Sequence, residues 1–150
     1  MGEGLSGRLL AVVEALPLRV GMRVLEVGCG PGAAAREVAR RVAGGAGGSA
    51  GSGGFVLGVD RSGNAVRLAE AGSGELIAAG VLGFRQVAVE ELELGPGEAG
   101  FDLVFAVRVG ALDGRHPELE QEARRRIAAV LRPGGRFFVD GGDPLREVQL

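Results

Sequence analysis

The chain has 150 residues, a length that suits one domain (1–150) built around a single hydrophobic core. Its formal net charge of -2 creates no basic field, so we expect no nucleic-acid partner. The single cysteine, Cys29, excludes an internal disulfide, and no apolar run approaches the roughly 18 residues that a membrane span requires. We therefore expect a cytoplasmic protein with no membrane partner and no signal peptide.

The first third of the chain combines a helix, a strand and a glycine turn. Apolar residues recur at helical spacing over 3–16, and Pro17 ends this predicted helix. The run 23–28 predicts a strand that is apolar apart from one acid. Three alternating glycines follow, and apolar positions 35, 38, 39 and 42 predict the next helix. A strand, a glycine turn and a helix in this order let the backbone approach a ligand at the helix N-terminus.

The rest of the chain alternates strands with helices. Residues 44–54 are rich in glycine and serine, which predicts a flexible surface loop and not a domain boundary. Ser62 or Asn64 is suited to cap the helix after the second strand. This alternation predicts an α/β fold with a doubly wound parallel sheet. The expected strands are 55–60, 83–89, 101–107 and 136–140, and the expected helices are 63–80 and 117–131.

Four segments in order resemble motifs of the class I S-adenosylmethionine-dependent methyltransferases, over most of the chain. The run Val24 to Gly32 resembles motif I, and 56–60 resembles the second strand with its ribose-binding acid. Residues 101–106 resemble the fourth strand, and 131–136 resemble the turn into the fifth. The resemblance implies a Rossmann-like sheet of order 3-2-1-4-5, S-adenosyl-L-methionine as cofactor and methyltransferase activity.

The family fold has two further strands, 6 and 7, beyond the fifth. Only ten residues follow Asp140, which we expect to be too few for them. The strand at 136–140 would then lie at an exposed edge of the sheet. We expect either a partner subunit, as in a homodimer, or a C-terminal segment to cover that edge.

The first four strands are expected to end at Gly28, Asp60, Val89 and Ala106, around one crevice. The resemblance implies that Glu26 organises the ammonium end of the cofactor and that Asp60 accepts the ribose hydroxyls. Each acid also has a structural alternative. Glu26 would be a buried acid satisfied by backbone donors, and Asp60 would be a helix cap. The cofactor-binding candidates are Glu26, Gly28, Cys29, Gly30, Gly32, Asp60, Arg61, Ala88, Val89, Glu90 and Ala106.

The adenine end departs from the family pattern. Ala88 stands where many members carry an acid that accepts from the adenine amino group. Adenine recognition would then depend on shape and on the backbone of Val89, or on Glu90 one position later. Arg61 is placed either over the adenine or as an ordinary exposed arginine.

The loop after the fourth strand carries the catalytic candidates, Asp113 and His116. His116 precedes Pro117, so a capping or surface role is the alternative to a general base. The segment 106–109 is Ala-Val-Arg-Val and not the Asn-Pro-Pro-Tyr type that amino-methylating enzymes of nucleic acids and proteins often carry. This difference favours a small-molecule methyl acceptor, and no metal is expected.

Two other functions fit parts of the pattern. An NAD(P)- or flavin-binding oxidoreductase is the first, because Gly28, Gly30 and Ala33 also satisfy the dinucleotide fingerprint. Pro31, Glu26 and the small space left for a hydride acceptor's site stand against it. The second is a non-catalytic cofactor-binding or assembly module, which the missing adenine acid and the short C-terminus favour.

Overall fold

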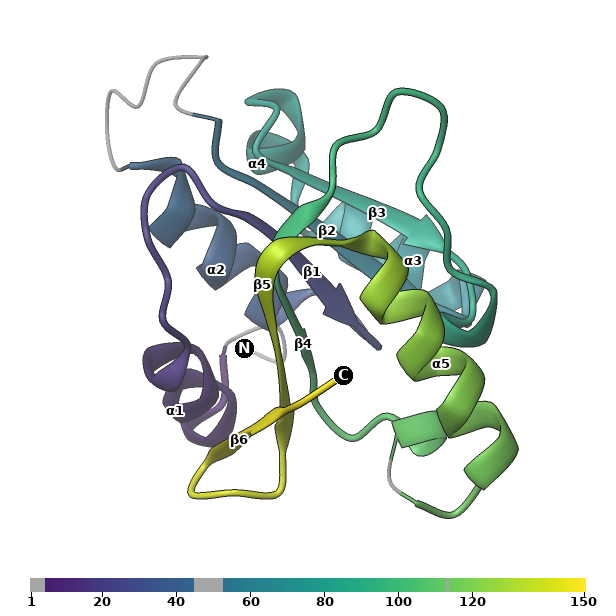
Figure 1. Cartoon of the computed structure of the whole chain (residues 1–150). Coiled ribbons are helices and arrows are strands. Elements are labelled where there is room, and N and C mark those ends of the chain that lie inside the picture. The colour runs from purple at the N-terminus through teal and green to yellow at the C-terminus, as the bar shows by residue number, and fades with distance from the viewer. Residues whose placement is uncertain (1–4, 45–52, 113) are drawn as a thin grey trace.

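The computed structural model describes residues 5–44, 53–112 and 114–150. Figure 1 shows one twisted sheet with helices on both faces. Within the described residues the strand order is β3-β2-β1-β4-β5-β6, which confirms the predicted order 3-2-1-4-5. The first five strands are parallel, and β6 runs antiparallel to β5. The strands are β1 (Arg23–Val27), β2 (Phe55–Asp60), β3 (Leu82–Gln86), β4 (Phe101–Ala106), β5 (Leu131–Asp140) and β6 (Leu145–Val148).

Helices cover the two faces of the sheet in separate apolar layers. Side chains of α5 pack with Leu25, Leu57 and Val104 on one face, and side chains of α1 and α2 pack with Val24 and Val56 on the other. Neighbouring strand residues thus serve opposite faces, as the period of two requires. The helices are α1 (Gly7–Ala15), α2 (Ala33–Ala43), α3 (Gly63–Ala71), α4 (Gly74–Ala78) and α5 (Pro117–Val130), and the 3₁₀ turns are η1 (Val89–Glu91) and η2 (Gly110–Leu112).

The helix predicted over 63–80 is wrong in one respect, because it is two helices. Ser62 caps α3, with its hydroxyl accepting from the Ala65 amide, as predicted. The chain breaks at Gly72 and Ser73, where the guanidinium of Arg36 from α2 lies. A Cβ built on Gly72 would lie 3.0 Å from Arg36 Nη1, so the break makes room for a side chain of another element.

The third strand is shorter than predicted. It ends at Gln86, and Val89 lies in the 3₁₀ turn η1 instead of on the strand. The Val87 amide still donates to the Asp60 carbonyl (3.0 Å), and the chain then turns with the Glu91 amide bonded to the Ala88 carbonyl (2.9 Å). The chain after β3 therefore turns at the carboxyl edge of the sheet instead of continuing as a strand.

The predicted exposed edge of the fifth strand is also wrong. Residues 145–148 form β6, which pairs with β5 from Phe137 opposite Val148 to Asp140 opposite Leu145. Ten residues suffice because four of them turn the chain and four pair. A C-terminal segment is thus the cover, and the expected homodimer stays a prediction. Most of the predicted loop at 44–54 (residues 45–52) lies outside the described residues.

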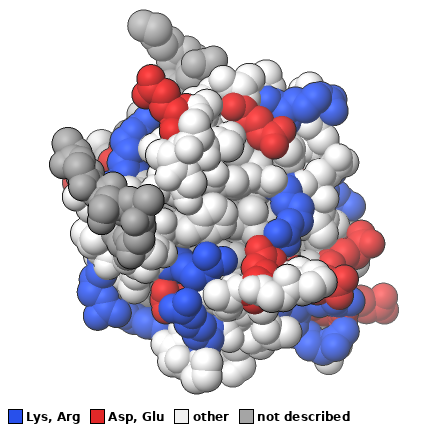
Figure 2. Space-filling model, turned by 90° about the horizontal axis from the view of Figure 1, so that it is seen from above, with Lys and Arg blue, Asp and Glu red and all other residues white. Residues whose placement is uncertain are grey.

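Charged side chains are interspersed over the surface. In the face that Figure 2 shows, basic and acidic groups alternate, and neither sign forms a continuous field. The helices in the described part of the chain are all too short or too polar to span a bilayer.

Candidate functional site

A crevice of about 440 Å³ lies at the carboxyl ends of the first three strands. Gly28, Asp60 and Val89 line it together, as the sequence predicts. Its opposite wall comes from the loop after β4 and the start of α5. Of the other candidates, Arg61, Ala88, Glu90 and His116 also line the crevice.

The turn after β1 is bound tightly to the end of β2. The amides of Gly28 and Cys29 both donate to the Val59 carbonyl, at 2.8 and 2.9 Å. The φ angles of Gly28, Gly30 and Gly32 are 73°, 53° and 89°, in the left-handed region that favours glycine. A Cβ on Gly28 would also meet Val109 Cγ2 at 2.7 Å. Of the candidates in this turn, Gly28 lines the crevice, whereas Cys29, Gly30 and Gly32 do not.

Asp60 connects the glycine turn to the start of α3. Its Oδ2 accepts from the Gly30 amide (2.9 Å) and its Oδ1 from the Ser62 amide (2.9 Å). A carboxylate has about four acceptor positions, so each oxygen retains capacity for a ligand hydroxyl. The helix cap is Ser62, and the alternative role of Asp60 as that cap is therefore not needed.

Glu26 lies behind the glycine turn, 3% exposed, and does not line the crevice. Burial raises its pKa well above the usual value; a hydrogen bond from the Ala35 backbone lowers the pKa, and the charge of Asp60 raises it. Within the described residues, Glu26 Oε1 is a buried acceptor without a hydrogen-bond partner. A buried acceptor of this kind costs about 1–3 kcal/mol, so a cationic ligand at the turn would relieve that cost.

Cys29 is a buried, inert thiol. Burial, followed by the charges of Glu26 and Asp60, raises its pKa well above the usual range. Its Sγ donates to the Gly30 carbonyl (3.6 Å). The thiol is thus neutral and packed against the turn, and its backbone is the part that a ligand could use.

Ala106 does not line the crevice. It lines an adjoining hollow of about 490 Å³ at the ends of β4 and β5. The crevice and this hollow share Arg108 and Val109, so the two spaces adjoin one another along the loop after β4. Parallel strand ends share one edge of the sheet, but this loop divides the edge into two spaces.

The two catalytic candidates have different outcomes. His116 lines the crevice and precedes α5 without a side-chain capping bond. Asp113 lies outside the described residues. Among the described residues, no group of three or more His, Cys, Asp and Glu side chains is arranged to hold a metal ion.

Sequence reasoning missed the roles of Val109 and Asp140. Val109 packs over Gly28, and Asp140 accepts from the Arg108 amide (3.1 Å) across the hollow. From the sequence, Asp140 is identified only as the last residue of the predicted strand 136–140. Its position opposite the loop after β4 depends on the register of β4 with β5, which no local pattern encodes.

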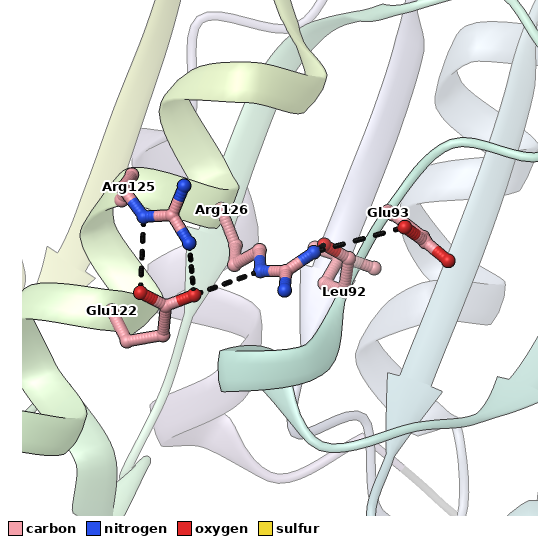
Figure 3. Close-up of polar contacts among 5 residues, drawn as sticks. All are labelled: Leu92, Glu93, Glu122, Arg125 and Arg126. Carbon is pink, nitrogen blue, oxygen red and sulfur yellow. Dashed lines mark hydrogen bonds and ion pairs between the residues drawn. The ribbon is translucent and has the colours of Figure 1, made fainter.

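Polar contacts join α5 to the segment that follows η1, as Figure 3 shows. Arg126 donates to the Leu92 carbonyl (3.4 Å) and pairs with Glu93 (3.8 Å), next to the turn η1 that carries Val89. Glu122 orients Arg126, at 3.0 Å from its Nε, and also binds Arg125. Hydrogen bonds from Arg125 and then Arg126 lower the pKa of Glu122.

Known proteins share this fold. A family model described as a methyltransferase domain matches residues 18–149. No curated protein sequence matches the chain. The YcgJ protein of Bacillus subtilis is similar at 24% identity and a TM-score of 0.66, with 88% of this chain and 49% of that chain covered.

Two further solved structures are similar. A SAM-dependent methyltransferase from Thiobacillus denitrificans, solved with S-adenosyl-L-homocysteine, has 22% identity and a TM-score of 0.63, covering 91% of this chain and 48% of its own. The [4+2]-cyclase SpnF has 28% identity and a TM-score of 0.65, covering 87% and 42%. The chain thus spans less than half of the length of these three proteins.

Proposed function

The chain belongs to the methyltransferase-domain family, and we propose that it binds S-adenosyl-L-methionine in the crevice and methylates a small molecule. The observation that carries the proposal is the placement of two acids, Asp60 and Glu26, on either side of one glycine turn. Asp60 is held at the mouth by the Gly30 amide, and Glu26 leaves a buried oxygen unpartnered behind the turn. A ligand with a sugar at one end and an ammonium group at the other would satisfy both.

The residues present fit the cofactor end by end. Asp60 would accept the ribose hydroxyls, and Glu26 would face the ammonium group. The bare backbone of the glycine turn would lie under the methionine part. Arg61, Ala88, Val89 and Glu90 would enclose the adenine, with backbone and shape replacing the missing acid.

The bound cofactor supplies a methyl group on a sulfonium, which is already activated for displacement. The protein's task is to position the acceptor in line and to exclude water. Arg108 and Val109 border both spaces, so the acceptor would enter from the adjoining hollow. His116 would serve as a base only where the acceptor must lose a proton before attack.

The rival functions gain no support from these matches. The family model describes a methyltransferase domain, and none of the three similar structures is described as an oxidoreductase. SpnF is described as a cyclase, so a test of this chain must measure methyl transfer as well as binding.

Titration calorimetry of the chain with S-adenosylhomocysteine tests the binding step. We expect saturable binding that Asp60→Asn weakens about tenfold to a hundredfold, because a hydrogen bond to a charged group contributes about 1.5–3 kcal/mol. Glu70→Gln removes an exposed acid of α3 and should leave affinity unchanged. Binding of NAD(P) in place of S-adenosylhomocysteine would contradict the proposal. Formation of S-adenosylhomocysteine from S-adenosylmethionine over an acceptor panel then tests transfer.

A further inference from the structure

The two basic side chains that line the hollow beside the crevice are not paired with its two acidic ones in the described residues. Four charged side chains line it: Arg108, Glu120, Asp140 and Arg146. Both acids already have partners from outside the lining. Asp140 accepts from Arg8 (3.1 Å), and Glu120 pairs with Arg124 (3.7 Å).

The two arginines of the hollow have no such partner. Within the part of the chain that the structure describes, neither the Arg108 nor the Arg146 guanidinium makes a hydrogen bond or ion pair. Arginines elsewhere are commonly paired, as Arg85 is with Glu98 and Arg136 with Glu147. Two planar donors with five N–H groups each therefore border one space without a hydrogen bond to any described residue.

The backbone at Arg108 is held in an unusual conformation. Its φ is 55°, and it is the one non-glycine residue with positive φ among those described. Its amide donates to Asp140 Oδ1 at 3.1 Å, while Arg8 binds Oδ2 of the same carboxylate. Strain of this kind costs about 1–3 kcal/mol and persists where the surroundings impose it. Asp140 thus fixes the backbone that carries one of the two free guanidinium groups.

We infer that the methyl acceptor carries a carboxylate or phosphate group, which Arg108 and Arg146 bind in this hollow. The inference rests on the proposed function, because it assigns the substrate class of the same site. Arg108 borders both spaces, so an anion held there leaves the rest of the acceptor facing the crevice. Guanidinium groups match both anions by bidentate hydrogen bonding.

The test is a nuclear magnetic resonance titration of the full chain, ¹⁵N-labelled, that follows arginine Nε–H signals. All 17 basic residues are arginines, so no lysine competes for the added anion. The probes are inorganic phosphate and, separately, benzoate, each at constant ionic strength. We expect saturable shifts of the Arg108 and Arg146 signals, and the more effective probe identifies which anion the hollow prefers.

Two variants and one control make the titration decisive. Arg146→Gln removes a guanidinium that lines the hollow and not the crevice. Arg108→Asn removes the guanidinium that borders both spaces, and asparagine tolerates the positive φ at this position. Each should weaken binding of the preferred anion at least fivefold. The control is Arg67→Gln, which removes an exposed arginine of α3 that has no partner in the described residues. It should leave binding of the anion unchanged.

The outcomes separate this inference from the proposed function. Parallel, unsaturated shifts of all arginine signals, or equal affinity in Arg146→Gln and the unaltered chain, would overturn the anion site. S-adenosylhomocysteine binding is measured in the same samples. If it persists while the anion site fails, only the inference is lost; if it is absent, the proposed function fails whatever the anion does.

Discussion

Glu26 is the residue at which stability and cofactor binding oppose one another. Burial raises its pKa above the ordinary 4.5, while the unfolded chain ionises near that value. Above pH 4.5 the unfolded state therefore binds fewer protons than the folded state. The contribution of Glu26 to the free energy of unfolding therefore falls as pH rises from about 4.5 towards the pKa of the folded state.

Glu26→Gln should remove this pH dependence. In urea unfolding without cofactor, we expect the free energy of unfolding of the variant, relative to that of the unaltered chain, to rise between pH 4 and pH 8. The same variant should bind S-adenosylhomocysteine about tenfold more weakly, because the ammonium group loses a charged acceptor. Stability curves that run parallel over this pH range would contradict the burial argument. Unchanged affinity would contradict the ammonium role.

At the scale of elements, Arg36 joins the glycine turn to the helices over β2 and β3. It lies in α2 and is only 7% exposed. Its Nη1 donates to the Pro31 carbonyl (2.9 Å) and to the Ser73 hydroxyl (3.1 Å). Within the described residues Arg36 has no acidic partner. The hydrogen bonds to these two acceptors therefore offset the cost of burying its charge.

Arg36→Met should lower the free energy of unfolding by about 1–3 kcal/mol, because it leaves the buried Ser73 hydroxyl and the part-buried Pro31 carbonyl without this donor. Arg40→Met, in the same helix but exposed, should cost less than about 0.5 kcal/mol. Urea unfolding measures both. A double-mutant cycle with Ser73→Ala should give a coupling above about 0.5 kcal/mol. Additive effects would mean that Arg36 does not act through Ser73.

The same contact shows why the sequence predicts some elements and not others. The strands at 55–60 and 101–106 are found because buried parallel strands are continuous apolar runs. The division of 63–80 into two helices depends on Arg36, 36 residues before Gly72, and a local pattern does not contain it. Long, periodic elements are thus predictable, and breaks imposed by another element are not.

Predictability of the site follows the same division. Gly28 and Asp60 meet because parallel strands end at one edge, which their order in the chain already implies. Ala106 falls in the neighbouring hollow because the loop after β4 turns at Arg108, which has positive φ. An arginine gives no local signal of that conformation, since glycine and asparagine are the residues that favour it.

At the scale of the whole molecule, β6 decides how the sheet ends. The segment Leu145–Val148 is short and has two charged residues at its centre, so no apolar pattern marks it as a strand. It is a strand because β5 offers unpaired backbone groups beside it. Val148 is buried in the core, and Glu147 pairs with Arg136 across the two strands (2.8 Å). Pairing and burial together close an edge that carries Phe137, Phe138 and Val139.

Removal of residues 141–150 should therefore expose a long apolar edge and cause self-association. We expect sedimentation velocity to show a molecular mass that rises with concentration, because the freed strand pairs with a second copy. A chain that ends at Val148 retains β6 and is the matched control. It should sediment like the full chain at every concentration. If the shorter variant instead sediments identically to this control, β6 does not protect the edge, and the four ladder pairs from Phe137 to Asp140 contribute little to keeping copies apart.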